Sequence, residues 1–232
     1  MFFDPMYLLF LAPGLLLALL AQWRVSSAYH RASQVPASTG YSGAKTAAEI
    51  LRESGVGGVA IDVVPGQLTD HYDPGEKVLR LSPDVYRGRN LAALGIAAHE
   101  AGHAIQDAKK YPLLGLRNGL VPLANFGGSV GWLMIAAGLV MALSGLVYAG
   151  IAVFSLTVLF QLVNLPVEFD ASRRAKAELV ANGLIAPAEE REVARVLSAA
   201  ALTYVAATLT SILTLFYFLF RAGAGSQTAD ES

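Results

Sequence analysis

Long stretches without a charged side chain are the feature that most restricts how this chain can fold. No charged residue lies between Asp4 and Arg24, in the fifty positions 118–167, or between Arg195 and Arg221. An α-helix needs roughly 20 apolar residues to cross the hydrocarbon core of a bilayer, so these stretches have room for one, two and one crossings. The sequence therefore predicts a mainly α membrane protein with four transmembrane helices.

The composition agrees with this prediction and excludes other classes of protein. Of the 232 residues, 54% are hydrophobic and only 15% are charged, whereas a soluble domain has about a quarter charged residues. A net charge of −1 offers no basic surface, so no nucleic-acid partner is expected. Cysteine is absent, so a bound metal must use imidazole, carboxylate or water as ligands.

The uncharged stretches and their flanks divide the chain into six segments. We expect a transmembrane anchor at 1–23, a cytoplasmic α+β domain at 24–118, a transmembrane hairpin at 119–167, cytoplasmic helices at 168–200, a transmembrane helix at 201–221 and a polar tail at 222–232. Met1–Pro5 has no Lys or Arg, and no small-residue cleavage site follows Leu20, so the first helix is expected to be a retained anchor. Frequent Gly and Ala in the hairpin predict that its helices pack closely.

The positions of the cations predict the orientation in the membrane. Eleven of the seventeen Lys and Arg residues lie between Arg24 and Arg117, and five lie between Arg173 and Arg195. Four crossings put both segments on one side, and the positive-inside rule makes that side cytoplasmic. The expected location is the cell (inner) membrane, with a multi-pass chain.

The segment 24–118 is long enough for a small α+β domain. Ser42 is predicted to cap a helix that ends near Glu53, and Asn90 to cap a helix that reaches about Lys109. Alternating apolar residues and turn residues predict three strands between these helices, at 59–64, 68–72 and 77–81.

The second of these helices contains His99-Glu100-Ala101-Gly102-His103. Positions i and i+4 lie on one face of a helix, so the two imidazoles can bind the same ion. Glu100 can reach a water on that ion without being a ligand, and Ala101 and Gly102 are expected to leave room above the metal. The pattern indicates a zinc site with His99 and His103 as ligands and Glu100 as the catalytic base; the alternative is a chance match.

A catalytic zinc site needs a third protein ligand and an open position for water. The candidates are His30, His71 and the carboxylates. Glu168 is the first charged residue after the hairpin, which returns the chain to the side of the membrane where the motif helix lies. Glu168 can therefore meet the two histidines, or it is an anion at the membrane interface.

Three further features each have two interpretations. His71 either hydrogen-bonds the oxyanion that develops on a substrate, which is a second catalytic role, or pairs with an aspartate of its own turn. The strand at 77–81 is either an edge strand that pairs with a substrate or an interior strand. Asp170 and Arg173 either support the ligands by hydrogen bonds or form a solvated pair.

The motif helix, residues 165–175 (LPVEFDASRRA) and residues 70–82 (DHYDPGEKVLRLS) resemble the membrane-bound neutral zinc metallopeptidases of bacteria. The resemblance covers nearly the whole chain. It implies a zincin-like domain that binds one zinc ion through His99, His103 and Glu168, with Glu100 as base. A more distant likeness is to integral-membrane heat-shock and prenyl-protein proteases, in which an Asp usually follows the Glu ligand by four positions; Ser172 stands there in this chain.

These features together predict a membrane-embedded zinc-dependent endopeptidase that works at the cytoplasmic face. We expect the metal to activate a water, with Glu100 accepting its proton and passing it to the leaving amine. The expected partners are the lipid bilayer and protein or peptide substrates, membrane proteins among them. The alternatives are an intramembrane protease, against which the charged residues around the motif helix argue, and a non-catalytic zinc-binding membrane adaptor.

Overall fold

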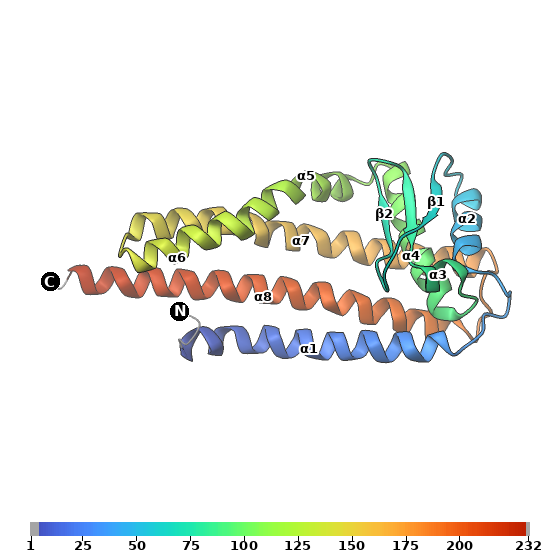
Figure 1. Ribbon diagram of the computed structural model, residues 1–232, viewed down its shortest axis with the longest axis horizontal. Helices are drawn as coiled ribbons and strands as arrows, with labels where there is room; N and C mark the ends of the chain where they lie inside the picture. The colour runs from blue at the N-terminus through green and yellow to red at the C-terminus, as the bar shows by residue number, and fades with distance from the viewer. Residues whose placement is uncertain (1–4, 231–232) are drawn as a thin grey trace. The chain divides into compact units, whose positions relative to one another are not determined.

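The computed structural model describes residues 5–230, and the side chains up to residue 223. Residues 1–4 of the predicted anchor and the last two residues of the predicted polar tail lie outside the described part. Figure 1 shows the order of the elements. They are α1 (Pro5–Ser33), α2 (Gly43–Glu53), β1 (Ala60–Val63), β2 (His71–Asp73), β3 (Val78–Leu81), α3 (Pro83–Arg87), α4 (Leu91–Ala108), α5 (Pro112–Phe126), the π-helical turn η1 (Gly127–Gly131), α6 (Trp132–Val140), α7 (Ser144–Ala181) and α8 (Glu190–Asp230).

Four stretches of helix in the described chain are long and apolar enough to cross a membrane. They are α1, the run α5–η1–α6, α7 and α8. This confirms the prediction of a mainly α membrane protein with four transmembrane helices and a small mixed α and β part. Pro166 lies inside α7, so the second hairpin helix and the helix that carries Glu168 are continuous. Membrane helices tolerate proline because neighbouring groups satisfy the backbone carbonyl that it leaves unpaired.

The chain forms two compact units. The membrane unit contains the described residues up to Leu20, Leu116–Pro166 and the residues from Thr203 onward. The site unit contains Ala21–Gly115 and Val167–Leu202.

The membrane unit is held together where glycines let helices approach closely. A Cβ added at Gly131 would lie 2.7 Å from the backbone nitrogen of Phe154, and one added at Gly150 would lie 2.8 Å from that of Ile135. These contacts join η1 and α6 to α7, which confirms the expected close packing of the hairpin. Around them lies a buried cluster that includes Ile135, Val147, Ile151, Phe154, Tyr217 and Phe218.

The site unit contains a three-stranded sheet in the order β1-β3-β2. β3 pairs in parallel with β1 and antiparallel with β2. The strand predicted at 77–81 is therefore interior, and the interpretation of it as an edge strand is wrong. Leu79 and Leu81 of β3 are fully buried, which explains why this strand occupies the centre. Strand β2, which pairs with β3 alone, is an edge strand.

The two predicted helix caps of the site unit are confirmed. The Ser42 side chain accepts a hydrogen bond from the Lys45 amide, and the Asn90 side chain accepts one from the Ala93 amide. Each cap satisfies one amide that has no partner inside its helix. The apolar sides of α2 and α4 then enter one core with the sheet, α7 and α8, which includes Ile50, Leu79, Leu94, Ile105, Leu179 and Val193.

Candidate metal centre

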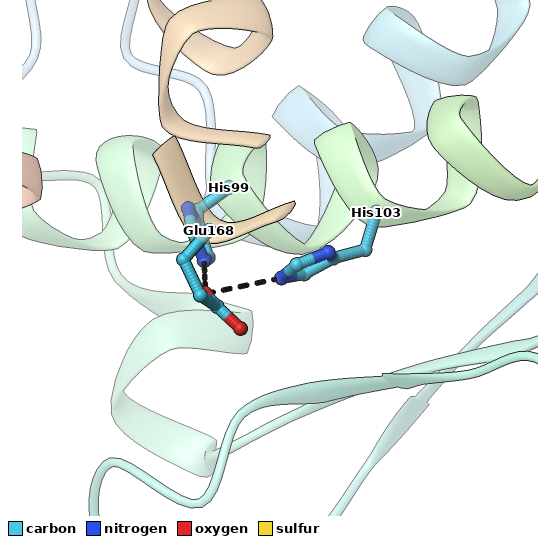
Figure 2. Close-up of side chains that lie close together, drawn as sticks. All are labelled: His99, His103 and Glu168. Atoms are coloured by element: carbon cyan, nitrogen blue, oxygen red, sulfur yellow. Dashed lines mark hydrogen bonds and ion pairs between the residues drawn. The ribbon is translucent and has the colours of Figure 1, made fainter. Parts of the chain in front are cut away.

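Helix α4 and helix α7 bring three ligand-type side chains of the site unit together. Figure 2 shows His99 and His103 of α4 directed toward Glu168 of α7. The Nε2 atoms of His99 and His103 lie 3.3 Å and 3.5 Å from the same oxygen, Oε2 of Glu168. One ligand atom from each residue lies within 4.8 Å of the others. Within the described chain, this is the only group of three or more such side chains with the spacing of a metal site.

Gly102 allows α7 to approach α4 at this point. A Cβ at position 102 would lie only 2.6 Å from the backbone oxygen of Ala171, so only glycine fits there without movement of a helix. Gly102 therefore faces α7, and the expectation that it leaves room above the metal is wrong. Glu168 precedes Ala171 by about one helical turn, so the close approach brings its carboxylate to the histidines.

A buried carboxamide determines which nitrogen of His103 faces the site. Gln106 donates through Nε2 to the Val167 carbonyl at 2.8 Å and to Asp170 at 2.9 Å. Both of its hydrogens are used, so its oxygen faces His103 Nδ1, 3.0 Å away, and accepts the hydrogen of that nitrogen. In the neutral ring, the hydrogen on Nδ1 leaves the lone pair on His103 Nε2, which faces Glu168.

His99 is supported in the same way by a hydroxyl group. Ser172 Oγ lies 3.2 Å from His99 Nδ1, so both Nδ1 atoms have partners behind the site. Ser172 is the residue four positions after Glu168, and its hydroxyl contacts the His99 ring.

Asp170 supports the site through Gln106 and is buried. Arg174 Nε donates to Asp170 at 2.5 Å, and Arg173, whose side chain is largely exposed, also contacts its carboxylate. Burial raises the pKa of Asp170, but these hydrogen bonds outweigh it and hold the pKa below its usual range. Of the two interpretations of Asp170, the structure therefore favours support of the ligands. The contributions of Gln106 and Ser172 were missed from the sequence, although Gln106 lies three positions after His103, on the same face of α4.

The electrostatics of the group suit a cation. Glu168 is 2% exposed, and its burial raises the pKa of the carboxyl. The hydrogen bonds from His103 and His99 outweigh burial and bring the pKa below its ordinary value. Burial lowers the pKa of His103, but the Glu168 carboxylate outweighs it and raises the pKa. The buried Glu168 carboxylate thus stabilises a positive charge on the imidazoles. A metal ion can take the place of the imidazole proton, because a histidine must be neutral to bind a metal.

Glu100 is buried on α4 but is not a member of the three-residue group. It lies close enough to Asp70, the residue before β2, for its charge to act there: burial raises the pKa of Asp70, and the Glu100 charge adds to the increase. Asp70 is held in place by the amide and hydroxyl of Ser82, at 2.7 Å and 3.1 Å. The charge of Glu100 therefore acts on the residue that precedes β2.

The other two histidines lie outside the group. His71 is exposed at the beginning of β2, where its Nδ1 contacts the Thr69 carbonyl at 2.8 Å rather than a neighbouring aspartate. Its proposed contact with an oxyanion stays a prediction. His30 is exposed near the end of α1.

The donor set fits zinc. Two imidazole nitrogens and one carboxylate oxygen leave one position of a tetrahedral ion open, which is the arrangement of catalytic rather than structural zinc sites. Together with four helices of membrane length, these features are those of a membrane zinc metallopeptidase.

Comparison with known proteins agrees with this class. A family described as "Putative neutral zinc metallopeptidase" matches residues 7–223. The chain belongs to this family of zinc metallopeptidases. It is similar to the "Putative membrane protease YugP" of Bacillus subtilis (strain 168), with 47% identity over 199 residues that cover 86% of this chain and 88% of the relative. No solved structure matches the chain.

Proposed function

We propose that this protein is a zinc-dependent endopeptidase that hydrolyses peptide bonds at the cytoplasmic face of the cell membrane. The observation that carries the proposal is the convergence of His99 Nε2, His103 Nε2 and the Glu168 carboxylate, with both Nδ1 atoms engaged behind them. Glu100 stands beside this group as a buried carboxylate that is not needed as a ligand.

Each residue has a defined role in the reaction. A bound zinc ion supplies Lewis acidity, which makes a water more acidic and a substrate carbonyl more electrophilic. His99, His103 and Glu168 hold the ion. Glu100 accepts a proton from the water as it attacks the carbonyl carbon, and gives that proton to the amine when the C–N bond breaks.

The substrate is proposed to be a protein or peptide bound in an extended form along β2. This strand pairs with β3 on one side only, so the main-chain groups on its other side are free to pair with a substrate. Tyr72 of β2 donates a hydrogen bond to Asp107 of α4 at 2.6 Å, which ties the strand to the motif helix. The edge-strand mechanism considered for residues 77–81 thus applies to β2.

The proposed orientation and partners rest on charge and hydropathy. Sixteen of the seventeen Lys and Arg residues lie in the two segments that the positive-inside rule assigns to the cytoplasm. Those segments contain all of the proposed ligands. We therefore include membrane proteins among the proposed substrates, because a site at that surface can reach them.

The test is a Glu100→Gln variant, reconstituted in lipid and assayed with a fluorogenic peptide library. Loss of the base is expected to reduce the cleavage rate by about 10²–10⁴-fold, with one zinc still bound per chain by elemental analysis. Glu49→Gln, on the outer part of α2, is the matched control and is expected to cleave normally.

Two results would contradict the proposal. Normal cleavage by Glu100→Gln would remove Glu100 from the mechanism. Stoichiometric zinc without any chelator-sensitive cleavage by the unmodified protein would support the non-catalytic membrane adaptor instead.

A further inference from the structure

A cavity of the site unit lies between α1 and α8, and none of the proposed zinc ligands lines it. Its volume is about 410 Å³, which is within the range of small-molecule pockets. Helix α1 contributes Trp23, Arg24 and Arg31, and helix α8 contributes Arg195. Ala28 and Ala199, both buried, form part of its apolar wall.

The cavity has an excess of positive charge. None of the residues that line it is acidic. Arg31 and Arg195 both pair with one carboxylate outside the lining, Glu192, at 3.6 Å and 2.6 Å. Arg24 has no ion-pair partner in the part of the chain that the structure describes. Three arginines thus line the cavity and only one carboxylate of the described chain pairs with any of them, so a ligand with negative charge is favoured.

The cavity lies at the level where two helices leave their apolar stretches. In α1 the uncharged stretch ends at Trp23 and Arg24, and in α8 it begins after Arg195. Tryptophan is enriched at the level of the lipid head groups, where its ring contacts both apolar and polar material. Basic pockets between membrane helices on the cytoplasmic side bind the head groups of anionic lipids.

We propose that this α1–α8 pocket binds the phosphate of an anionic phospholipid. The arginines donate hydrogen bonds to the phosphate oxygens, because guanidinium groups match that geometry with two parallel donors. Trp23 and the alanine wall contact the glycerol and the first methylene groups of the chains. The proposal rests on insertion into a membrane, and it does not depend on the peptidase activity.

The experiment measures lipid binding by the full-length protein in detergent. Short-chain phosphatidylglycerol, phosphatidylcholine and inorganic phosphate are titrated separately, and bound lipid is counted by native mass spectrometry. The unmodified protein is expected to prefer phosphatidylglycerol. The double variant Arg24→Gln/Arg195→Gln is expected to weaken phosphatidylglycerol binding by about thirtyfold, since each cation near an anionic lipid contributes roughly fivefold.

The control is Arg52→Gln/Arg191→Gln, which removes the same charge from exposed positions outside the pocket. Its lipid binding is expected to stay within about twofold of the unmodified protein. If the double variant does not fold, Arg24→Gln alone provides the test, because this side chain has no ion pair to lose.

Three outcomes would overturn the proposal. Equal affinity for phosphatidylglycerol and phosphatidylcholine would show that charge is not recognised. Equal losses in the pocket and control variants would show a general surface effect. Binding of inorganic phosphate as tight as that of phosphatidylglycerol would make this a site for a free anion.

Discussion

At the scale of single residues, the uncharged side chain of Gln106 organises the group of proposed ligands. It connects His103 to Asp170 and to the Val167 carbonyl, and so joins the motif helix to α7 through one buried side chain. Because it can accept from His103 only in one orientation, it determines which tautomer of the imidazole is present. The spacing of the two histidines predicted the ligands, but nothing local distinguishes this glutamine from any other polar residue on a helix.

Replacing Gln106 by leucine is expected to weaken zinc binding by about 10–100-fold, because the His103 ring loses the partner that orients it. The zinc affinity can be measured by competition with a fluorescent chelator. Gln34→Leu, at an exposed position just after α1, is the control. An unchanged affinity in Gln106→Leu would show that the carboxamide does not position the ligand.

At the scale of elements, the contact between α4 and α7 decides whether the site is assembled. Gly102→Ala places a methyl group 2.6 Å from the Ala171 backbone oxygen, so the helices must separate. We expect a loss of about 1–3 kcal/mol in the free energy of unfolding, measured by denaturant titration. Gly57→Ala, where nothing lies within 4 Å, is the control. Equal stability of the two variants would exclude a tight contact at position 102.

The turn that precedes α8 is tied to the loop before α2 by Glu189. Its carboxylate accepts from the amide and hydroxyl of Ser38, each at 2.8 Å, and from the Ala186 amide at 2.6 Å. Burial raises the pKa of Glu189, but these hydrogen bonds outweigh it, and the pKa lies below its ordinary value. A carboxyl of this kind stabilises the fold above its unfolded pKa, and the contribution is lost as the pH falls through the folded pKa.

Glu189→Gln is therefore expected to cost about 1 kcal/mol of unfolding free energy at neutral pH. The difference from the unmodified protein should shrink once the pH falls to the ordinary pKa of a glutamate, and it should vanish when the pH lies below the lowered pKa of the native Glu189 carboxyl. Chemical denaturation across this pH range measures it, with the exposed Glu53→Gln as control. A difference that is constant with pH would argue against the ionised carboxylate as the cause.

At the scale of the whole molecule, the proposed metal belongs to one of the two compact units. All three proposed ligands lie in the site unit, and a ligand that binds only the folded form stabilises the part that it holds together. At a free zinc concentration of about 100 times the dissociation constant, the expected stabilisation is about 2.7 kcal/mol.

Removal of the metal with a chelator is expected to increase hydrogen exchange in α4 and in residues 167–181 of α7. Exchange in α6 and the first half of α7 should change little, because those segments belong to the membrane unit. Mass spectrometry of the protein in detergent, before and after chelation and after return of zinc, measures both effects. An equal increase of hydrogen exchange in both units, or no change of exchange on chelation, would contradict a metal that is held only in the site unit.

The features that could be predicted from the sequence are those that depend on local physics. Charged side chains are too costly to bury in hydrocarbon, so the uncharged stretches already set the number of crossings. The caps at Ser42 and Asn90, and the facing histidines of α4, follow from the geometry of one helix. Only the tertiary structure decided the central place of β3, the contact at Gly102, the pairing of Gln106 with His103 and the arrival of Glu168 at the histidines. These depend on how distant elements pack against one another, because a helical period specifies which face is buried but not which residue of another helix it meets.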